Sequence, residues 1–171
     1  MPTKNHQSIV EEKLKALNLR IPEPIKSSQD VKMPPSWIRV RGNRAFISGH
    51  GPQNPDGSIA GPFGKVGSDD VTLQQGYQAA RLATLSILGT LKRELGDLDK
   101  VTAWLMVQGF VNVATGFTQT TAIINRCSEL ILELYGPEVG QHARTAMGVA
   151  TTPFGLPVII AAEVEIDNND I

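Results

Sequence analysis

Apolar positions along the chain recur at helical spacing in two long segments. From residue 72 to 95 they fall three or four apart, and Gly96 supplies the residue that commonly follows a helix C-terminus. A second helix is predicted from about 118 to 135, where the dipeptide Gly136–Pro137 is a stop signal. Both segments are amphipathic, so each is expected to bury one face against the rest of the protein.

Other segments have the pattern of β-strands. Residues 37–50 alternate between polar and apolar on both sides of a Gly-Asn pair, which predicts a β-hairpin. Residues 101–113 form a nearly continuous apolar run typical of a central strand covered on both faces, and further strands are predicted near 145–150 and 157–166. The order of these elements predicts an α+β fold in which two long helices cover one face of a mixed β-sheet.

The N-terminal segment differs in composition from the rest. Ser8 and Glu11 have the spacing of a capping box, which predicts a short helix over residues 8–18, followed by a proline-rich linker. We therefore divide the chain into an N-terminal helix and linker (1–35), a single folded domain (36–167) and a C-terminal tail (168–171).

Composition narrows the class of protein. The chain has 171 residues, of which 41% are hydrophobic and 19% are charged, as in an ordinary soluble domain. Its formal net charge of −1 does not favour nucleic acid or a membrane as a partner, and a cytoplasmic location is expected. Cys127 is the one cysteine, so neither a disulfide framework nor a Cys-x-x-Cys metal site can form within the chain. No cofactor or metal is expected.

Arg144 calls for an explanation, because it directly precedes a run of small and apolar residues. Burying an unpaired charge costs several kcal/mol, so its guanidinium reaches solvent, pairs with a carboxylate of the protein or binds an anionic ligand. Glu163 and Glu165 share one face of the last strand, where a solvated strand end explains them more simply than acid–base chemistry. His50 stands beside a strand end, where an isolated histidine is more often a polar surface residue than a ligand of a metal.

Several strings of this sequence, taken in order, resemble a known family. They are NRAFISGHGP, GKVG, QGYQAARLATLSILGTLK, LGDLDKVTAWLMVQGFVN, INRCSELILELYG and HARTAMGVATTPFG. Together they are similar to the Rid/YjgF family of reactive intermediate deaminases, also known as L-PSP endoribonucleases or translation inhibitors, and closest to a longer branch with an added N-terminal helix. The resemblance covers residues 36–167 and implies a chorismate mutase-like fold in a barrel-shaped homotrimer, with a ligand cleft at each subunit interface.

The resemblance also implies a set of site residues. Arg144, in the string ART, stands where the family has an arginine that forms a fork to the substrate carboxylate, as suits a planar guanidinium. Ser48 and Asn125 match polar residues of the same cleft. Backbone groups of Met147 or Gly148 are expected to contribute further hydrogen bonds.

Two positions depart from the family pattern. Ile159 stands where deaminating members carry the glutamate that activates water, and Ala161 replaces a second glutamate two residues on. The family's cleft tyrosine falls at Pro35 in this sequence, so either Pro35 or Trp37 occupies its space. If hydrolysis persists, His50 is the candidate replacement for the missing base.

Three functions follow from these residues. The first is hydrolysis of 2-imino or enamine acids to 2-oxo acids and ammonia, with Arg144 and Ser48 as catalytic residues. The second is a module that binds carboxylate metabolites in the same clefts, formed by Arg144, Ser48, Asn125, Met147, Gly148 and Trp37, without turnover. The third is an endoribonuclease, which the balanced charge and the absence of a visible His/Lys pair make the weakest.

Overall fold

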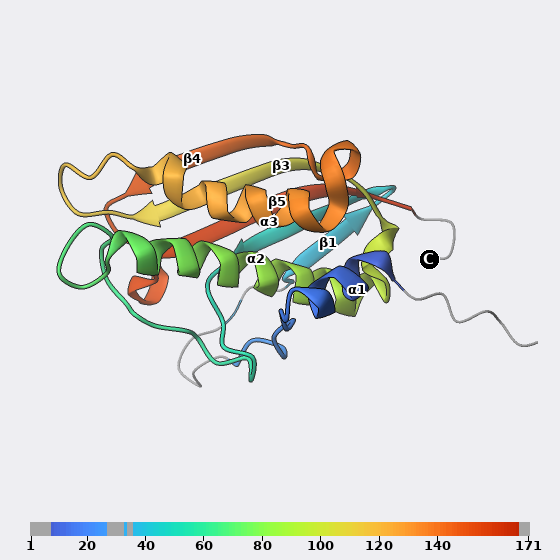
Figure 1. Ribbon diagram of the computed structural model, residues 1–171, viewed down its shortest axis with the longest axis horizontal. Coiled ribbons are helices and arrows are strands. Elements are labelled where there is room, and N and C mark those ends of the chain that lie inside the picture. Colours follow the sequence, from blue (N-terminus) through green and yellow to red (C-terminus); the bar gives the residue numbers. More distant parts are fainter. Residues whose placement is uncertain (1–7, 27–32, 34–35, 168–171) are drawn as a thin grey trace, which may run out of the picture.

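The computed structural model describes residues 8–26, 33 and 36–167 as helices packed on one side of a five-stranded β-sheet (Figure 1). The strand order is β1-β2-β5-β3-β4. β3 and β4 are parallel and the other neighbouring pairs are antiparallel, so the sheet is mixed. The predicted α+β class and the placement of two long helices on one face of the sheet are confirmed.

The strands follow the sequence pattern closely. β1 (Ile38–Arg41) and β2 (Arg44–His50) form the predicted hairpin, whose two-residue turn begins at Gly42 with a φ of 59°. β3 (Val101–Asn112) lies between β4 (Ala143–Val149) and β5 (Val158–Ile166). β4 begins two residues earlier than the predicted strand 145–150, because Ala143 already pairs with Met106 of β3.

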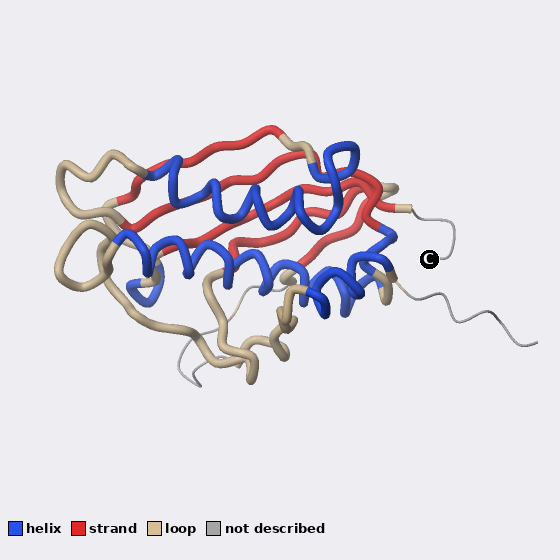
Figure 2. Tube along the Cα trace, viewed as in Figure 1, coloured by secondary structure: helices blue, strands red, loops and turns tan. Residues whose placement is uncertain are grey.

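Two long helices, α2 (Leu73–Leu95) and α3 (Thr120–Gly140), cover one face of the sheet, as Figure 2 shows. Thr72 and Gln75 form a capping box at the start of α2, and Gly96 ends it with a left-handed φ of 76°. The stop signal at Gly136 interrupts α3, where φ and ψ are non-helical, and one further turn follows before β4.

The short helix α1 (Ile9–Ala16) packs beside α2 and α3. Ser8 is its N-cap, but the side chain of Glu11 forms an ion pair with Lys92 of α2 instead of closing the predicted capping box. Val10 and Leu14 are buried in the common core, so the N-terminal helix is part of the folded body. The predicted tail 168–171, linker residues 27–32 and Pro34–Pro35 lie outside the described residues.

The two faces of β3 differ from the predicted alternation at one residue. Regular alternation along the predicted central strand would place Trp104, Met106 and Gln108 on one side of it. Trp104 instead faces the helices, where it is 1% exposed and its ring centroid lies 5.7 Å from that of Tyr135. The cause is a register irregularity between Trp104 and Met106 in the pairing of β3 with β5, which shifts the alternation by one residue.

The other face of the sheet is not covered by any described helix. Phe46 on this face and Met147 on β4 are 43% and 54% exposed. Both side chains are therefore open to solvent or to another molecule in this structure. No helix within the described ranges is both long and apolar enough to cross a lipid bilayer.

Candidate functional site

Arg144 lies on the edge strand β4 and points toward the helices. Arg144 pairs with Val107 of β3, and paired residues of neighbouring strands project to the same face of a sheet. Val107 is fully buried beneath the helices, so the guanidinium lies against α3. The side chain is half-buried in this position.

Close packing of α3 on the sheet sets this geometry. A Cβ atom at Gly109 of β3 would lie only 2.5 Å from Cδ1 of Ile124, so α3 can approach the strand here only because the residue is glycine. The hydroxyl of Thr120 also donates a hydrogen bond to the carbonyl of Ala146 in β4 at 3.1 Å. Together these contacts hold α3 within hydrogen-bonding distance of the Arg144 guanidinium.

Two neutral side chains of α3 hold this guanidinium. Nη1 of Arg144 donates to Oδ1 of Asn125 at 2.7 Å and to Oγ of Ser128 at 3.1 Å. Asn125 and Ser128 are three residues apart on α3 and therefore lie on one face of the helix. We call Arg144, Asn125 and Ser128 the arginine cluster.

The charge of Arg144 is not neutralised within the arginine cluster. Among residues 8–26, 33 and 36–167, no carboxylate forms an ion pair with it. Both hydrogen bonds of the cluster use Nη1, and an arginine also donates through Nη2 and Nε. Those donors, with a full positive charge, suit an external carboxylate better than a neutral ligand.

A histidine extends the cluster beyond Ser128. Nε2 of His142 lies 2.9 Å from Oγ of Ser128, and its Nδ1 lies 2.7 Å from the carbonyl oxygen of Gly140. Burial lowers the pKa of His142, and the nearby charge of Arg144 lowers it further, while the hydrogen bond to Gly140 acts in the opposite direction. The imidazole is therefore neutral at neutral pH.

The remaining predicted residues of β4 point in different directions. Met147 pairs with Phe110 on the uncovered face of the sheet and is exposed. A Cβ at Gly148 would lie 2.9 Å from Val113 and 3.4 Å from Thr120. The Met147 side chain thus lies on the opposite face from the arginine cluster and Gly148 has no side chain, so only backbone groups of these two residues share the strand with Arg144.

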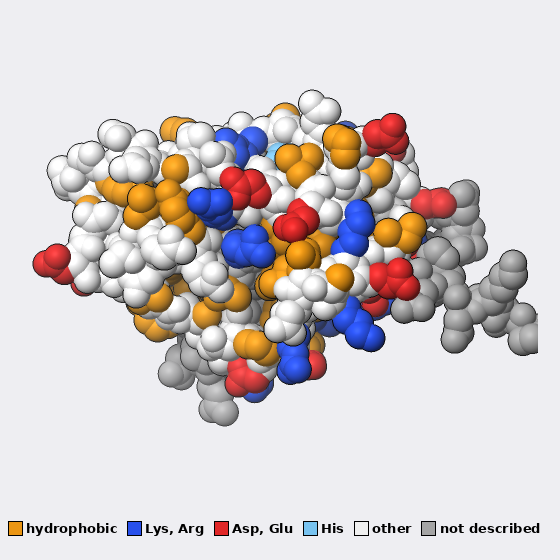
Figure 3. Space-filling model, viewed as in Figure 1, with side chains coloured by type: hydrophobic (Ala, Val, Ile, Leu, Met, Phe, Trp, Pro, Cys, Tyr) orange, Lys and Arg blue, Asp and Glu red, His pale blue; other side chains and the backbone are white. Residues whose placement is uncertain are grey.

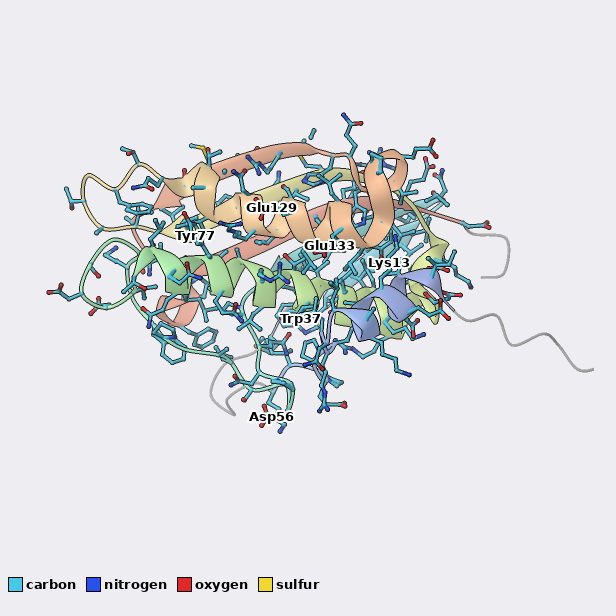
Figure 4. All side chains as sticks on the ribbon, in the orientation of Figure 1. Lys13, Trp37, Asp56, Tyr77, Glu129 and Glu133 are labelled. Carbon is cyan, nitrogen blue, oxygen red and sulfur yellow. The ribbon has the colours of Figure 1, made fainter. Side chains whose placement is uncertain are left out.

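Ser48 and Trp37 lie on another side of the same chain. β3 and β5 separate the strand of Ser48 from that of Arg144, which corresponds to about 14 Å across the sheet. Figure 4 shows Trp37 near the loop that carries Asp56, apart from Glu129 on α3. Ser48 donates a hydrogen bond to the carbonyl of Ser36 at 3.1 Å. The single chain therefore brings Arg144 and Asn125 together but not Arg144 and Ser48.

Ser48 and Trp37 line a cavity of about 400 Å³, which we call the apolar pocket. Its walls come mainly from loop residues and the start of β5, with Ile59, Leu156 and Ile159 among the aliphatic side chains. Ile159 contacts the backbone at Gly49, where a Cβ would lie 2.8 Å from Cγ2 of Ile159. An aliphatic side chain at this position offers no hydrogen bond to a water molecule.

His50 is buried rather than exposed, which corrects the expectation of a polar surface residue. It is 3% exposed, with Nδ1 2.6 Å from the carbonyl of Ser48 and Nε2 2.8 Å from the hydroxyl of Thr90. Burial lowers its pKa to about 4, opposed by the hydrogen bond to Ser48 and supported by the charge of Arg93. Both ring nitrogens are thus engaged inside the fold.

The contacts of the two strand glutamates and the burial of Cys127 explain these residues without a chemical role. Glu163 forms an ion pair with Arg44, and Glu165 accepts a hydrogen bond from Thr102 at 3.2 Å. Cys127 is fully buried in the core, as its helical position predicts, and burial raises the pKa of its thiol to about 11. In the described part of the chain, no three His, Cys, Asp or Glu side chains gather closely enough to hold a metal ion.

Ser128 and His142 were not predicted from the sequence. Only their spacing from the predicted site residues could have indicated them. Ser128 is three residues after Asn125 on the same helical face, and His142 is two residues before Arg144. Neither residue belongs to a motif by itself. Only the packing of α3 against β4 brings the three polar side chains around the guanidinium.

Comparison with a family model and with curated proteins connects the chain to known sequences. Residues 11–162 match a family described as "YjgF/chorismate mutase-like, putative endoribonuclease". "Protein TCP17" of Trypanosoma cruzi is 39% identical over 127 residues, which are 74% of this chain and 78% of that protein.

Solved structures extend the similarity to the whole fold. The protein Atu1372 of Agrobacterium tumefaciens, described as having unknown function, is 34% identical with a TM-score of 0.79, over 93% of this chain and 94% of that one. A "putative endoribonuclease" of Shewanella oneidensis is 26% identical with a TM-score of 0.82, over 94% of this chain and 100% of that one.

Proposed function

Because the chain belongs to the YjgF/chorismate mutase-like family, we propose that it binds small metabolites that carry a carboxylate, with Arg144 as the carboxylate-recognising group. The observation that supports this most directly is the pairing of Arg144 with neutral partners. Charges taken out of water are usually paired with an opposite charge. Asn125 and Ser128 instead fix the half-buried guanidinium in place, and no carboxylate of the described residues neutralises its charge. A bound carboxylate would complete the site.

The geometry of the cluster favours a fork-shaped contact. With Nη1 engaged by α3, the edge formed by Nη2 and Nε remains for two parallel hydrogen bonds to a carboxylate. Such bidentate contacts are shorter and stronger than neutral hydrogen bonds, and partial burial reduces screening by water. Asn125 and Ser128 are then positioning residues, because they orient the guanidinium before the ligand arrives.

A small acid fits this chain better than RNA. Binding to a polynucleotide draws most of its affinity from an excess of basic side chains along the phosphate backbone. The chain has a formal net charge of −1, and on the helix-bearing side acidic and basic side chains are interspersed (Figure 3). Arg144 supplies a single cationic group rather than an extended basic surface.

We further propose that the protein forms a homotrimer, in which the apolar pocket of one subunit lies against the arginine cluster of the next. Two features support it. The exposed Phe46 and Met147 mark the uncovered face of the sheet as a surface suited to another subunit, and β4 is an edge strand that carries Arg144 to the rim of the chain. In that arrangement Ser48, Trp37 and Arg144 would line one cleft between subunits.

The proposal is tested by ligand-induced stabilisation. Ligand at about 100 times its Kd adds about 2.7 kcal/mol to the free energy of unfolding, so 2-oxobutyrate and benzoate should raise the melting temperature of the protein. Arg144→Ala should abolish the shift. Arg126→Ala is the matched control, because Arg126 lies on α3 but pairs with Glu129 and stacks on Tyr77 at 4.6 Å, away from the cluster. A shift that survives Arg144→Ala contradicts the proposal.

A further inference from the structure

One wall of the apolar pocket comes from the segment between α1 and β1. Ile25 of this segment lines the pocket together with Trp37 and Ile159 of the main domain. Residues 21–26, which we call the linker segment, form neither helix nor strand. A connecting segment can form a lasting wall only if its backbone is fixed, because loops are otherwise the more mobile parts of a fold.

Hydrogen bonds attach the linker segment to the loop that follows β2. The amide of Glu23 donates to the carbonyl of Pro55 at 3.0 Å, and the amide of Lys26 donates to the carbonyl of Gly57 at 2.9 Å. These two donors flank Ile25 in the sequence. A Cβ at Gly57 would lie 2.3 Å from a backbone oxygen of the linker segment, so this close approach requires a glycine.

The start of the linker segment is fixed to α2. A Cβ at Gly89 would lie 2.9 Å from Cγ2 of Ile21 and 3.2 Å from the carbonyl oxygen of Pro22. Nη1 of Arg93, one turn later on the same helix, donates to that carbonyl at 3.0 Å. The linker segment is therefore held by both a loop and a helix, and Ile25 is a fixed part of the pocket.

The chemistry of the pocket favours an uncharged group. The described residues that line it include no charged side chain. Its serine and its glutamine already donate to the protein, Ser48 to the carbonyl of Ser36 at 3.1 Å and Gln53 to the carbonyl of Gly57 at 3.3 Å. The volume of about 400 Å³ lies within the range of about 300 to 1,000 Å³ that is usual for small-molecule sites.

Two aromatic side chains line the pocket without being fully buried. Phe154 is 46% exposed and has a left-handed φ of 59°, which a bulky residue rarely adopts. Backbone strain of this kind persists where the surrounding structure holds it and is common at ligand sites. Trp37 lies against the buried ring of His50, with 5.0 Å between the ring centroids. The fold thus fixes two large apolar surfaces beside an apolar cavity.

We propose that the apolar pocket binds the aromatic group of a small molecule, with Trp37 and Phe154 as its aromatic contacts and Ile25 as the residue that limits its size. Aromatic pairs attract each other beyond the gain from buried area, which favours an aromatic ring over an aliphatic group. The inference goes beyond the proposed carboxylate site. The three residues belong to one chain, so binding of an uncharged ring requires neither Arg144 nor a second subunit.

The test follows the amide NMR signals of the isotopically labelled full chain during titration with an uncharged probe. 2-Phenylethanol should shift the amides of Gly49, Gly51 and Ile159 with one dissociation constant, whereas 1,2-propanediol, which has no ring, should not. Phe154→Ala should weaken binding about tenfold, because an apolar contact is lost. Its mass in sedimentation should equal that of wild type. Arg144→Ala should bind the probe as wild type does.

A second variant tests the role of Ile25 in specificity. Ile25→Ala enlarges the pocket, so the affinity for 2-(2-naphthyl)ethanol relative to 2-phenylethanol should rise about tenfold. Ile9→Ala is the matched control, because Ile9 is 60% exposed on α1 and lies outside the pocket.

Three results overturn the inference: no saturable shift at the pocket amides in wild type, unchanged affinity in Phe154→Ala, or an unchanged probe ratio in Ile25→Ala. Loss of probe binding in Arg144→Ala also contradicts it, since the pocket would then not be a site of its own. A wild type that binds 2-phenylethanol but not 2-oxobutyrate overturns the proposed function and supports the present inference.

Discussion

Asp99 accepts a hydrogen bond from the backbone amide of Ile9 at 2.7 Å, although 90 residues separate them in the sequence. Its other oxygen accepts from the amide of Val10 at 3.0 Å and from the hydroxyl of Ser8 at 2.9 Å. A carboxylate from the 3-10 turn Leu98–Lys100 thus satisfies the free N–H groups at the start of α1, where the helix dipole also favours negative charge.

Removing this carboxylate should loosen the N-terminal helix. We expect Asp99→Ala to lower the free energy of unfolding by about 1 to 2 kcal/mol, because the amides of Ile9 and Val10 lose their acceptor. Amide hydrogen exchange should rise in residues 9–16 more than in α2. Asp69→Ala, an exposed loop substitution, is the control. Unchanged exchange in α1 would mean that burial of Val10 and Leu14 alone holds the helix.

Replacing Arg144 by lysine should separate charge from shape. Lysine keeps the positive charge but presents a single ammonium group, which cannot hold Asn125, Ser128 and both oxygens of a carboxylate in one plane. We expect Arg144→Lys to weaken 2-oxobutyrate binding about tenfold or more in isothermal titration calorimetry. Equal affinity in the lysine variant would show that the fork geometry is unimportant.

Mixing two defective variants should test whether the cleft is built by two subunits. In a cyclic trimer, each cleft would combine Arg144 of one subunit with Trp37 of the next, so a mixed trimer of Arg144→Ala and Trp37→Ala subunits contains one native cleft. Unfolding and refolding the two variants together should therefore restore binding that neither shows alone. Sedimentation should give the mass of three chains. A monomer, or no recovery on mixing, would contradict an intersubunit site.

The buried His50 should make the protein less stable in acid. In the unfolded chain this imidazole binds a proton below pH 6.5, but in the fold its pKa is about 4. Between these values the unfolded state binds more protons, so stability is full above pH 6.5 and falls as the pH drops toward 4. The loss reaches about 3 kcal/mol at the lower limit. Urea unfolding measured across this range should have a smaller slope against pH in His50→Gln than in wild type.

Most of the fold was predictable because its longest elements have strong periodicity. α2 extends over 23 residues and matches the predicted helix within one residue at its start and at its end. The β1–β2 hairpin was equally clear, since its turn residues have a direct conformational role. What the pattern could not predict was the register irregularity that turns Trp104 toward the helices, because it depends on how β3 pairs with β5.

The candidate site was predictable only in part for a similar reason. Arg144 and Asn125 were both expected from family resemblance, and they do lie in contact. Ser128 and His142 were not expected, because a serine on a helix and an isolated histidine are common in any sequence. Their place beside Arg144 depends on a contact between α3 and β4. The pattern of a single sequence carries no information about which helix and strand lie in contact.

The connection between α3 and β4 consists of Gln141 and His142 alone. Since side chains alternate along a strand, inserting or deleting one residue there would give Arg144 the orientation that Thr145 now has, toward the opposite side of the sheet. The guanidinium would then lose its contact with Asn125, although no other residue of the sequence had changed. Substitutions in related sequences can therefore alter the side chains around Arg144, but a change in the length of this connection would separate Arg144 from Asn125 and Ser128.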